Sequence, residues 1–518
     1  MSAVRPWAAW LAWLAPALAA CGPTSTPTGA PPAERTASGD EALDLDITFV
    51  PDISGNDGWF ERDADDAGPS MTGPRPLRLR SSDLGHTPDA RRLMALLLER
   101  APLAHTSLVL DAASACAPEL RAAAAQQRPA RMLIALDDAL TPEVVRCLAA
   151  LPTPRLYLTG CLYRAYRHEA CDGDADLAAL TTSPDATLAA RIAGLALSIR
   201  KPATLAALSH LPRLAYLALA TGEGTTAEAL FEALPFDGLP ALASLHLPLI
   251  LEGEGDVMAP GALRLIAQLR VLRWNGGLAL PLPTPCRLER VFNMRLSDDD
   301  AAARALPRLR VLETLDAGFT SAEPVTHWPA LTTLTTRHWP ATDLAPLATL
   351  TQLRHLGLGA SAATDFGVLA RLPQLRTLDL SQTALTSLDV LADLRALETL
   401  DVGFTAVRDL APLAKLTALA DLDLHATKVD DVTVLASLRA LRKLSLSQTA
   451  VRDLTPLTGL PRLAWLILYD SQVTDLGVLA SLPALERANI GGLRVPPAQV
   501  EALRQRLPSG VDGSPRSP

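Results

Sequence analysis

The amino-acid sequence predicts an α/β repeat fold, a solenoid that stacks short strands one repeat after another. The main observation is a sequence pattern that recurs every 22 residues through residues 331–492. Such self-similarity is the signature of a repeat architecture. Composition agrees, since 49% of the residues are hydrophobic but only 4% are aromatic, as expected of a core filled by aliphatic side chains. The first leucines of the copies are Leu331, Leu353, Leu375, Leu397, Leu419, Leu441, Leu463 and Leu485.

Each copy encodes a strand, a turn and a short helical segment. Positions one, four and six are apolar, and the alternation at residues 400–402 predicts a strand with one buried face. Position nine carries a hydroxyl that can bond to backbone groups of the turn and of the neighbouring copy. An aspartate or serine before the helical segment is expected to cap its free N–H groups. The hydroxyl residues are Ser361, Thr383, Thr405, Thr427, Thr449 and Ser471, and the capping residues are Asp365, Ser387, Asp409, Asp431, Asp453 and Asp475.

The pattern resembles the leucine-rich repeats of bacterial internalin-like proteins. The copy that starts at Leu397 reads LETLDVGFTAVRDLAPLAKLTA, which contains the motif L-x-x-L-x-L-x-x-T-x-V and a D-L-x-P-L-x-x-L return. The match is strong over residues 331–492 and loose over residues 106–330. The resemblance implies a curved parallel sheet on the concave face and short helices or 3-10 turns on the convex face. The family's usual asparagine at position nine is threonine or serine here, and a role in host adhesion is not implied.

The chain is predicted to contain six consecutive segments. In order, they are a lipoprotein signal peptide (1–20), a disordered tether (21–42), an N-terminal cap (43–105), irregular leucine-rich repeats (106–330) with an insert (160–185), regular 22-residue repeats (331–492), and a C-terminal cap helix with a loose tail (493–518). The tether is rich in Pro, Thr, Ser and Ala, which bury too little apolar surface to order themselves. Caps are expected because a solenoid must cover its terminal apolar layers.

The N-terminus is predicted to address the protein to the bacterial cell envelope. The apolar run at residues 7–20 has 14 residues, whereas about 20 are needed to span a bilayer, so it fits a signal peptide. It ends in L-A-A-C, which resembles the lipobox of bacterial lipoproteins and implies lipidation of Cys21. The alternative is an ordinary signal peptide followed by a chance cysteine. In such lipoproteins, an aspartate after the lipidated cysteine favours the inner membrane. The residue here is Gly22, which favours the outer membrane, where the protein would be either periplasmic or surface-exposed.

Charge and motifs argue against several classes of function. Formal net charge is −9, which disfavours nucleic-acid binding because that requires a basic face. Motifs for zinc proteases, serine hydrolases and phosphate-binding loops are absent. An aspartate-rich stretch at residues 172–176 departs from a calcium loop at Leu177 and Ser183. The sequence therefore predicts a protein that is not an enzyme, with no metal, cofactor or small-molecule substrate.

Two groups of exposed strand positions are candidates for binding a partner. Asp379, Asp401 and Asp423 recur at position five, so strands about 4.8 Å apart would place them in a ladder that attracts a cationic partner or a metal ion. The alternative is a solvated acidic face. An aromatic group lies beside the ladder, and exposed aromatic side chains are typical interface anchors, unless they pack against one another or an end cap. Its members are Phe404, His425, Trp465 and Tyr469.

Cysteines and the insert provide the remaining candidates. In an oxidising envelope, cysteine pairing is the default, so Cys161 with Cys171 and Cys116 with Cys147 are candidate disulfides, which leaves Cys286 over. The insert also carries Tyr163, Tyr166 and Arg167. These three side chains form either a second contact patch or a plug for the coil.

The function that these observations favour is a non-catalytic, lipid-anchored scaffold. We expect it to bind a protein partner through the concave face of the repeats and to contact the membrane through its lipid anchor. The main alternative is a structural envelope component that organises the surface without one specific partner.

Overall fold

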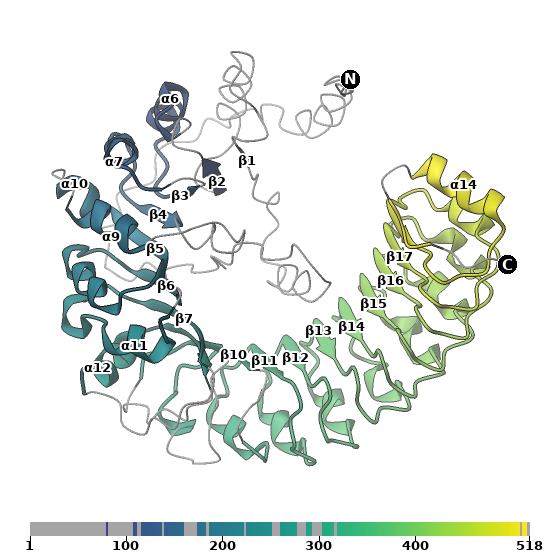
Figure 1. Cartoon of the computed structure of the whole chain (residues 1–518). Helices are drawn as coiled ribbons and strands as arrows, with labels where there is room; N and C mark the ends of the chain where they lie inside the picture. Colours follow the sequence, from purple (N-terminus) through teal and green to yellow (C-terminus); the bar gives the residue numbers. More distant parts are fainter. Residues whose placement is uncertain are drawn as a thin grey trace, which may run out of the picture. The chain divides into compact units, whose positions relative to one another are not determined.

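The computed structural model describes most of the repeat region (Figure 1). Its described residues are 79–80, 107–110, 115–136, 139–159, 173–182, 186–221, 224–250, 260–276, 286–292, 303–314, 319–507 and 510–514. They belong to one compact unit, residues 51–518, and the other unit, Met1–Val50, lies outside the described residues. The signal peptide with Cys21, the tether, most of the N-terminal cap, and the insert residues Cys161, Tyr163, Tyr166, Arg167 and Cys171 also lie outside them.

A single parallel sheet runs through the described part of the chain. Each strand pairs in parallel with the next strand in the sequence, from β1 to β19. This topology confirms the predicted solenoid. The strands are β1 (Leu79–Arg80), β2 (Ser107–Leu110), β3 (Met132–Leu136), β4 (Leu156–Thr159), β5 (Ile192–Ile199), β6 (Tyr216–Thr221), β7 (Ser244–Ile250), β8 (Val271–Gly276), β9 (Arg290–Phe292), β10 (Val311–Thr314), β11 (Thr333–Thr336), β12 (His355–Gly357), β13 (Thr377–Asp379), β14 (Thr399–Asp401), β15 (Asp421–Asp423), β16 (Lys443–Ser445), β17 (Trp465–Ile467), β18 (Arg487–Asn489) and β19 (Val511–Asp512).

The 22-residue period sets the register of the regular repeats. Leu378, Leu400 and Leu422 lie opposite one another on neighbouring strands, and all three are buried. Position-one and position-six side chains of these repeats are buried in the same core. Because side chains alternate across a strand, positions three and five face the opposite side, which is half-buried on most strands.

In the described part of the chain, the helical segments lie on the opposite side of the solenoid from the strands (Figure 1). Irregular repeats carry α-helices and 3-10 helices of three to nine residues, and regular repeats carry 3-10 turns of three to five residues. The α-helices are α6 (Pro118–Gln127), α7 (Pro142–Ala149), α9 (Gly173–Thr181), α10 (Ala186–Ala189), α11 (Ala227–Glu232) and α12 (Pro260–Gln268). The 3-10 helices are η2 (Pro202–His210), η3 (Phe236–Gly238), η4 (Glu323–His327), η5 (Ala345–Thr349), η6 (Gly367–Arg371), η7 (Asp389–Leu391), η8 (Ala411–Lys415), η9 (Thr433–Ser437), η10 (Thr455–Gly459) and η11 (Gly477–Ser481).

The hydroxyl and aspartate columns close the turns. Thr405 Oγ1 donates to the carbonyl oxygen of Val402 over 2.6 Å, and Thr383, Thr427 and Thr449 make the same bond within their own turns. Asp409 Oδ1 accepts from the first N–H of η8 over 2.8 Å, as the capping residues of the other regular repeats do. These contacts satisfy backbone groups that a short helical turn leaves unpaired.

Position eight has a backbone conformation that the sequence pattern does not suggest. Its residues have φ between +52° and +74° in eight successive copies, a left-handed region that favours glycine. Each N–H at this position donates to a position-seven carbonyl of the next copy, or to Ser514 at the C-terminal end, over 2.7–3.1 Å. The column therefore extends the inter-repeat hydrogen bonding beyond the strand end. It comprises His338, Ala360, Gln382, Phe404, Ala426, Gln448, Asp470 and Gly492.

The C-terminal end is covered by helix α14 (Pro497–Arg506). Its residues Val500 and Leu503 are buried against the last repeat, together with Leu507. Gln499 donates to Asp475 over 2.8 Å and accepts from the N–H of Leu476 over 2.9 Å. The segment after the helix is not entirely loose, because β19 adds a strand to β18.

Candidate partner-binding surface

The aspartate column lies in register on the exposed side of three neighbouring strands. Asp379 pairs with Asp401, and Asp401 with Asp423. Oδ1 of each accepts from the N–H two residues later over 2.8–2.9 Å. The donors are Ser381, Gly403 and His425, respectively. One oxygen of each carboxylate therefore closes a turn, a structural role, while the charges remain on a half-buried face.

Neighbouring columns divide the exposed face by charge. At position three, Asp421 on β15 lies opposite Lys443 on β16. Lys443 in turn lies opposite Trp465, which lies opposite Arg487. Aspartates thus concentrate on β13–β15, whereas the two cations lie on β16 and β18.

Phe404 and His425 form one aromatic pair of this surface. Their ring centroids are 4.6 Å apart, and the N–H of Phe404 donates to the carbonyl oxygen of His425 over 2.7 Å. Phe404 nevertheless remains 56% exposed and has φ +57°. An aromatic side chain that is both exposed and in a left-handed conformation is unfavourable for the isolated chain.

Trp465 forms a second cluster with the two cations. Lys443 Nζ lies 4.2 Å from the ring centroid, and Arg487 Cζ lies 4.8 Å from it. These separations permit cation–π attraction on both sides of Trp465. Its Nε1 is inaccessible to solvent and has no hydrogen-bond partner. The indole therefore packs partly against its own neighbours, in line with the alternative that the rings are structural.

Tyr469 is the other strongly exposed ring in the described part of the chain. It is 43% exposed, and only Phe404 and Tyr469 are exposed among the large hydrophobic side chains there. A Cβ added at Gly491 would lie 3.0 Å from Tyr469 Cδ2, so the ring lies close to that glycine. Tyr469 follows β17, whereas Phe404 follows β14, so the predicted aromatic group is divided into separate clusters.

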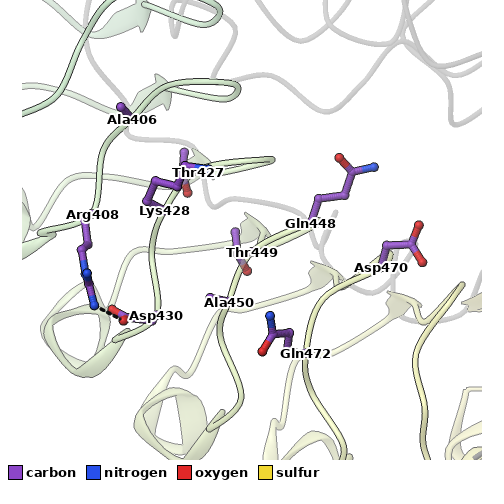
Figure 2. Close-up of a pocket in the computed structure, with 10 residues that line it drawn as sticks. All are labelled: Ala406, Arg408, Thr427, Lys428, Asp430, Gln448, Thr449, Ala450, Asp470 and Gln472. Carbon is purple, nitrogen blue, oxygen red and sulfur yellow. Dashed lines mark hydrogen bonds and ion pairs between the residues drawn. The ribbon is translucent and has the colours of Figure 1, made fainter.

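A groove of about 620 Å³ runs along the turns of the same repeats (Figure 2). It is lined by residues from positions eight to twelve of four successive copies. The sequence indicated a turn role for the position-nine threonines among them but did not predict a groove. Arg408 and Asp430 form an ion pair across it, with 2.5 Å between Nη2 and Oδ2. Phe404 and Tyr469 belong to the first and last of these four copies. The lining residues are Ala406, Arg408, Thr427, Lys428, Asp430, Gln448, Thr449, Ala450, Asp470 and Gln472.

Hydrogen bonds and burial change the pKa of a few nearby groups. The Thr433 hydroxyl, followed by its N–H, donates to Asp431 and lowers the pKa of that carboxyl, and Thr455 does the same for Asp453. On the exposed strand face, the pKa of His355 is lowered by burial first and then by Arg354 and Arg376. His355 is consequently neutral at pH 7 and is 3.0 Å from the Thr377 hydroxyl.

Of the cysteines, the structure joins Cys116 and Cys147 in a disulfide. The bond links residues on either side of β3, one just before α6 and the other within α7. Cys286 is a buried thiol, and burial raises its pKa to about 11. Within the described residues, no helix is long and apolar enough to cross a membrane.

Comparisons with known proteins returned one family match and several similar solved structures. A family model for leucine-rich repeats (two copies) matches residues 373–415. An internalin, inlF, from Listeria monocytogenes strain 4b F2365 is 22% identical, with a TM-score of 0.46, over 60% of this chain and 92% of that chain. Internalin C2 from the same strain is 30% identical, with a TM-score of 0.34, over 36% and 82%. A leucine-rich-repeat protein from Leptospira interrogans is 19% identical, with a TM-score of 0.49, over 72% and 92%. No curated protein matches the sequence.

The repeat geometry defines the class of protein. A 22-residue period, consecutive parallel strands and short 3-10 segments make this chain a leucine-rich-repeat protein. Such proteins are commonly scaffolds for protein interaction.

Proposed function

We propose that this protein is a non-catalytic scaffold of the bacterial cell envelope that binds a protein partner through the exposed strand face of its regular repeats. The observation that carries this proposal is the exposure of Phe404 (56%) and Tyr469 (43%). They lie in the first and last of four successive copies, of which the first two carry Asp401 and Asp423. Exposed aromatic rings beside charged groups are typical of interface anchors with a polar rim.

Two observations support location in the envelope. The sequence L-A-A-C ending at Cys21 resembles a lipobox. Such a cysteine is expected to carry more than one acyl chain, which anchors a protein stably. Cys116 and Cys147 are close enough to pair, and disulfides persist in oxidising compartments. The outer membrane is the proposed location because Gly22 follows the cysteine.

The binding test compares the truncation of exposed aromatic side chains with the truncation of a buried one. The double variant F404A/Y469A should lose a partner cross-linked to the wild type in intact cells, and should unfold at nearly the wild-type urea concentration. F366A is the matched control, because Phe366 is buried and its truncation should cost about 3–5 kcal/mol. If F404A/Y469A retains the cross-linked partner, the exposed rings do not anchor it.

Trp465 is a less suitable probe than the two exposed rings. Its contacts with Lys443 and Arg487 mean that truncation also removes packing within the chain. Loss of binding in W465A would therefore combine two causes. The anchor is tested separately with C21S, which should move the protein from the membrane fraction to the soluble fraction; continued membrane association would contradict lipidation.

The main alternative is a structural envelope component without one specific partner. The charge division between β13–β15 and β16–β18 favours a specific partner, because it would orient a bound chain. Under the alternative, cross-linking would recover no protein that depends on Phe404 or Tyr469.

A further inference from the structure

A second group of polar side chains lies on the exposed face of the irregular repeats, away from the partner-binding surface. His246 on β7, Arg273 on β8 and Phe292 on β9 lie opposite one another in register. Tyr216 on β6 contacts the first of them, since its hydroxyl is 3.4 Å from His246 Nδ1. These four residues come from four neighbouring strands and are not used by the proposed function.

Arg273 lacks the partner that a guanidinium with a buried nitrogen requires. Its Nε is inaccessible to solvent and has no hydrogen-bond partner, and no described carboxylate forms an ion pair with it. Its described contact is with the ring of Phe292, 4.6 Å from Cζ to the centroid. Arg273 is half-buried as a residue, and a partly buried charge is stabilised when it is paired and hydrogen-bonded, so an anion would satisfy this guanidinium.

A nearby arginine shows how the chain satisfies such a group. Arg270 precedes β8 and makes two hydrogen bonds to Glu289, at 3.1 Å and 2.9 Å. Both side chains of that pair are half-buried, as are His246, Arg273 and Phe292. The contrast indicates that Arg273 is left for a ligand.

His246 adds a donor beside the guanidinium. Burial, and to a lesser extent Arg273, lowers the pKa of His246 to about 3, so the ring is neutral at pH 7. When the Tyr216 hydroxyl donates to Nδ1, the proton of the neutral ring is on Nε2. The cluster then presents N–H groups of two side chains and, among its own four residues, no carboxylate.

We propose that Arg273 and His246 bind an oxyanion, either a carboxylate or a phosphate group, on the exposed face of β7 and β8. Arginine suits both groups because its planar fork makes two parallel hydrogen bonds to their oxygens. The anion comes from outside the chain, either as a carboxylate of a docked protein or as a free phosphate. The alternative source is the chain's own acidic segment, Glu252, Glu254 and Asp256, which follows β7 in the sequence.

The test measures thermal unfolding of the full-length protein in detergent during titration with sodium phosphate or sodium acetate, against sodium chloride of equal ionic strength. We expect a saturable rise in Tm for the wild type with at least one of the two anions, and at least tenfold weaker apparent binding for R273M. Saturation by phosphate alone indicates free phosphate, whereas saturation by acetate indicates a carboxylate. The control R264M removes an exposed arginine paired with Asp237 and should behave as the wild type.

Two further measurements distinguish anion binding by Arg273 from a structural role of this side chain. Without added anion, R273M should be at least as stable as the wild type, because it removes an unpaired charge; a merely structural arginine would instead leave R273M less stable. The variant E252Q/E254Q/D256N should bind the anions as the wild type does. The proposal is wrong if neither anion raises the Tm of the wild type, or if the anions raise the Tm of R273M equally. It is also wrong if the anions raise only the Tm of E252Q/E254Q/D256N.

Discussion

The rings of Phe404 and His425 lie with their centroids 4.6 Å apart and their planes tilted by 34°, while the N–H of Phe404 donates to the carbonyl oxygen of His425 over 2.7 Å. One residue thus couples two successive repeats through both its backbone and its side chain. The coupling requires a left-handed backbone at Phe404, φ +57°, which a residue with a Cβ adopts at a cost.

Substitution at Phe404 separates the backbone cost from the ring contact. F404G and F404A both remove the ring, but glycine has no Cβ and adopts positive φ freely. We expect F404G to be more stable than F404A by about 1 kcal/mol, measured from urea unfolding midpoints. A426G provides the control, because Ala426 occupies the same column with φ +54°. The free energy of unfolding of A426G should exceed that of the wild type by a similar amount. Equal midpoints for the glycine and alanine variants would contradict the strain.

The hydroxyl column offers a matched comparison of bonded and unbonded side chains. Thr405 donates to Val402 over 2.6 Å and is buried, whereas the hydroxyl oxygens of Ser361 and Ser471 are buried without a partner. T405V should lower the free energy of unfolding by about 1 kcal/mol because it removes a buried hydrogen bond while keeping the volume. S361A and S471A should change it by less than about 0.5 kcal/mol. The comparison fails if the serine variants lose as much stability as T405V.

The period made most of the regular region predictable. Because residues 22 positions apart share a column, the alignment of Lys443, Trp465 and Arg487 on neighbouring strands follows from the sequence once the register is known. The cap and hydroxyl columns were predictable for the same reason, since each carries a residue type with a known backbone preference. A hydroxyl bond to the neighbouring copy was also expected, but the four threonines bond within their own turns.

Features that do not repeat by residue type were not predictable. Position eight holds His, Ala, Gln, Phe and Asp before its only glycine, Gly492, so no composition signal indicates its left-handed backbone. The groove beside it depends on that backbone. Arg273 lies 27 residues after His246 and 19 before Phe292, so the 22-residue period does not connect these three residues.

The aspartate column can be separated into its turn-closing role and its charge. In D401N the Oδ1 acceptor for the Gly403 N–H remains, but the charge between Asp379 and Asp423 is removed. Asn489 at the end of β18 shows that an asparagine can accept this bond, because its Oδ1 accepts from the N–H of Gly491. D401N should therefore be at least as stable as the wild type, whereas D401A should lose about 1 kcal/mol with the hydrogen bond. Urea unfolding at low salt checks both, because salt screens the repulsion. A D401N variant that unfolds as easily as D401A would mean that the charge itself is stabilising.

Acid should destabilise the fold through His246. Its pKa is about 3 in the folded protein, lowered by burial and by Arg273, against the ordinary 6.5, so between these values the unfolded chain binds more protons. The stability contributed by the neutral ring is complete above pH 6.5 and decreases as pH falls toward 3. H246N removes this contribution while keeping a polar group beside Tyr216. Tm should therefore fall less steeply between pH 6.5 and pH 4 in H246N than in the wild type. Parallel pH curves for the two proteins would show that His246 titrates with an ordinary pKa.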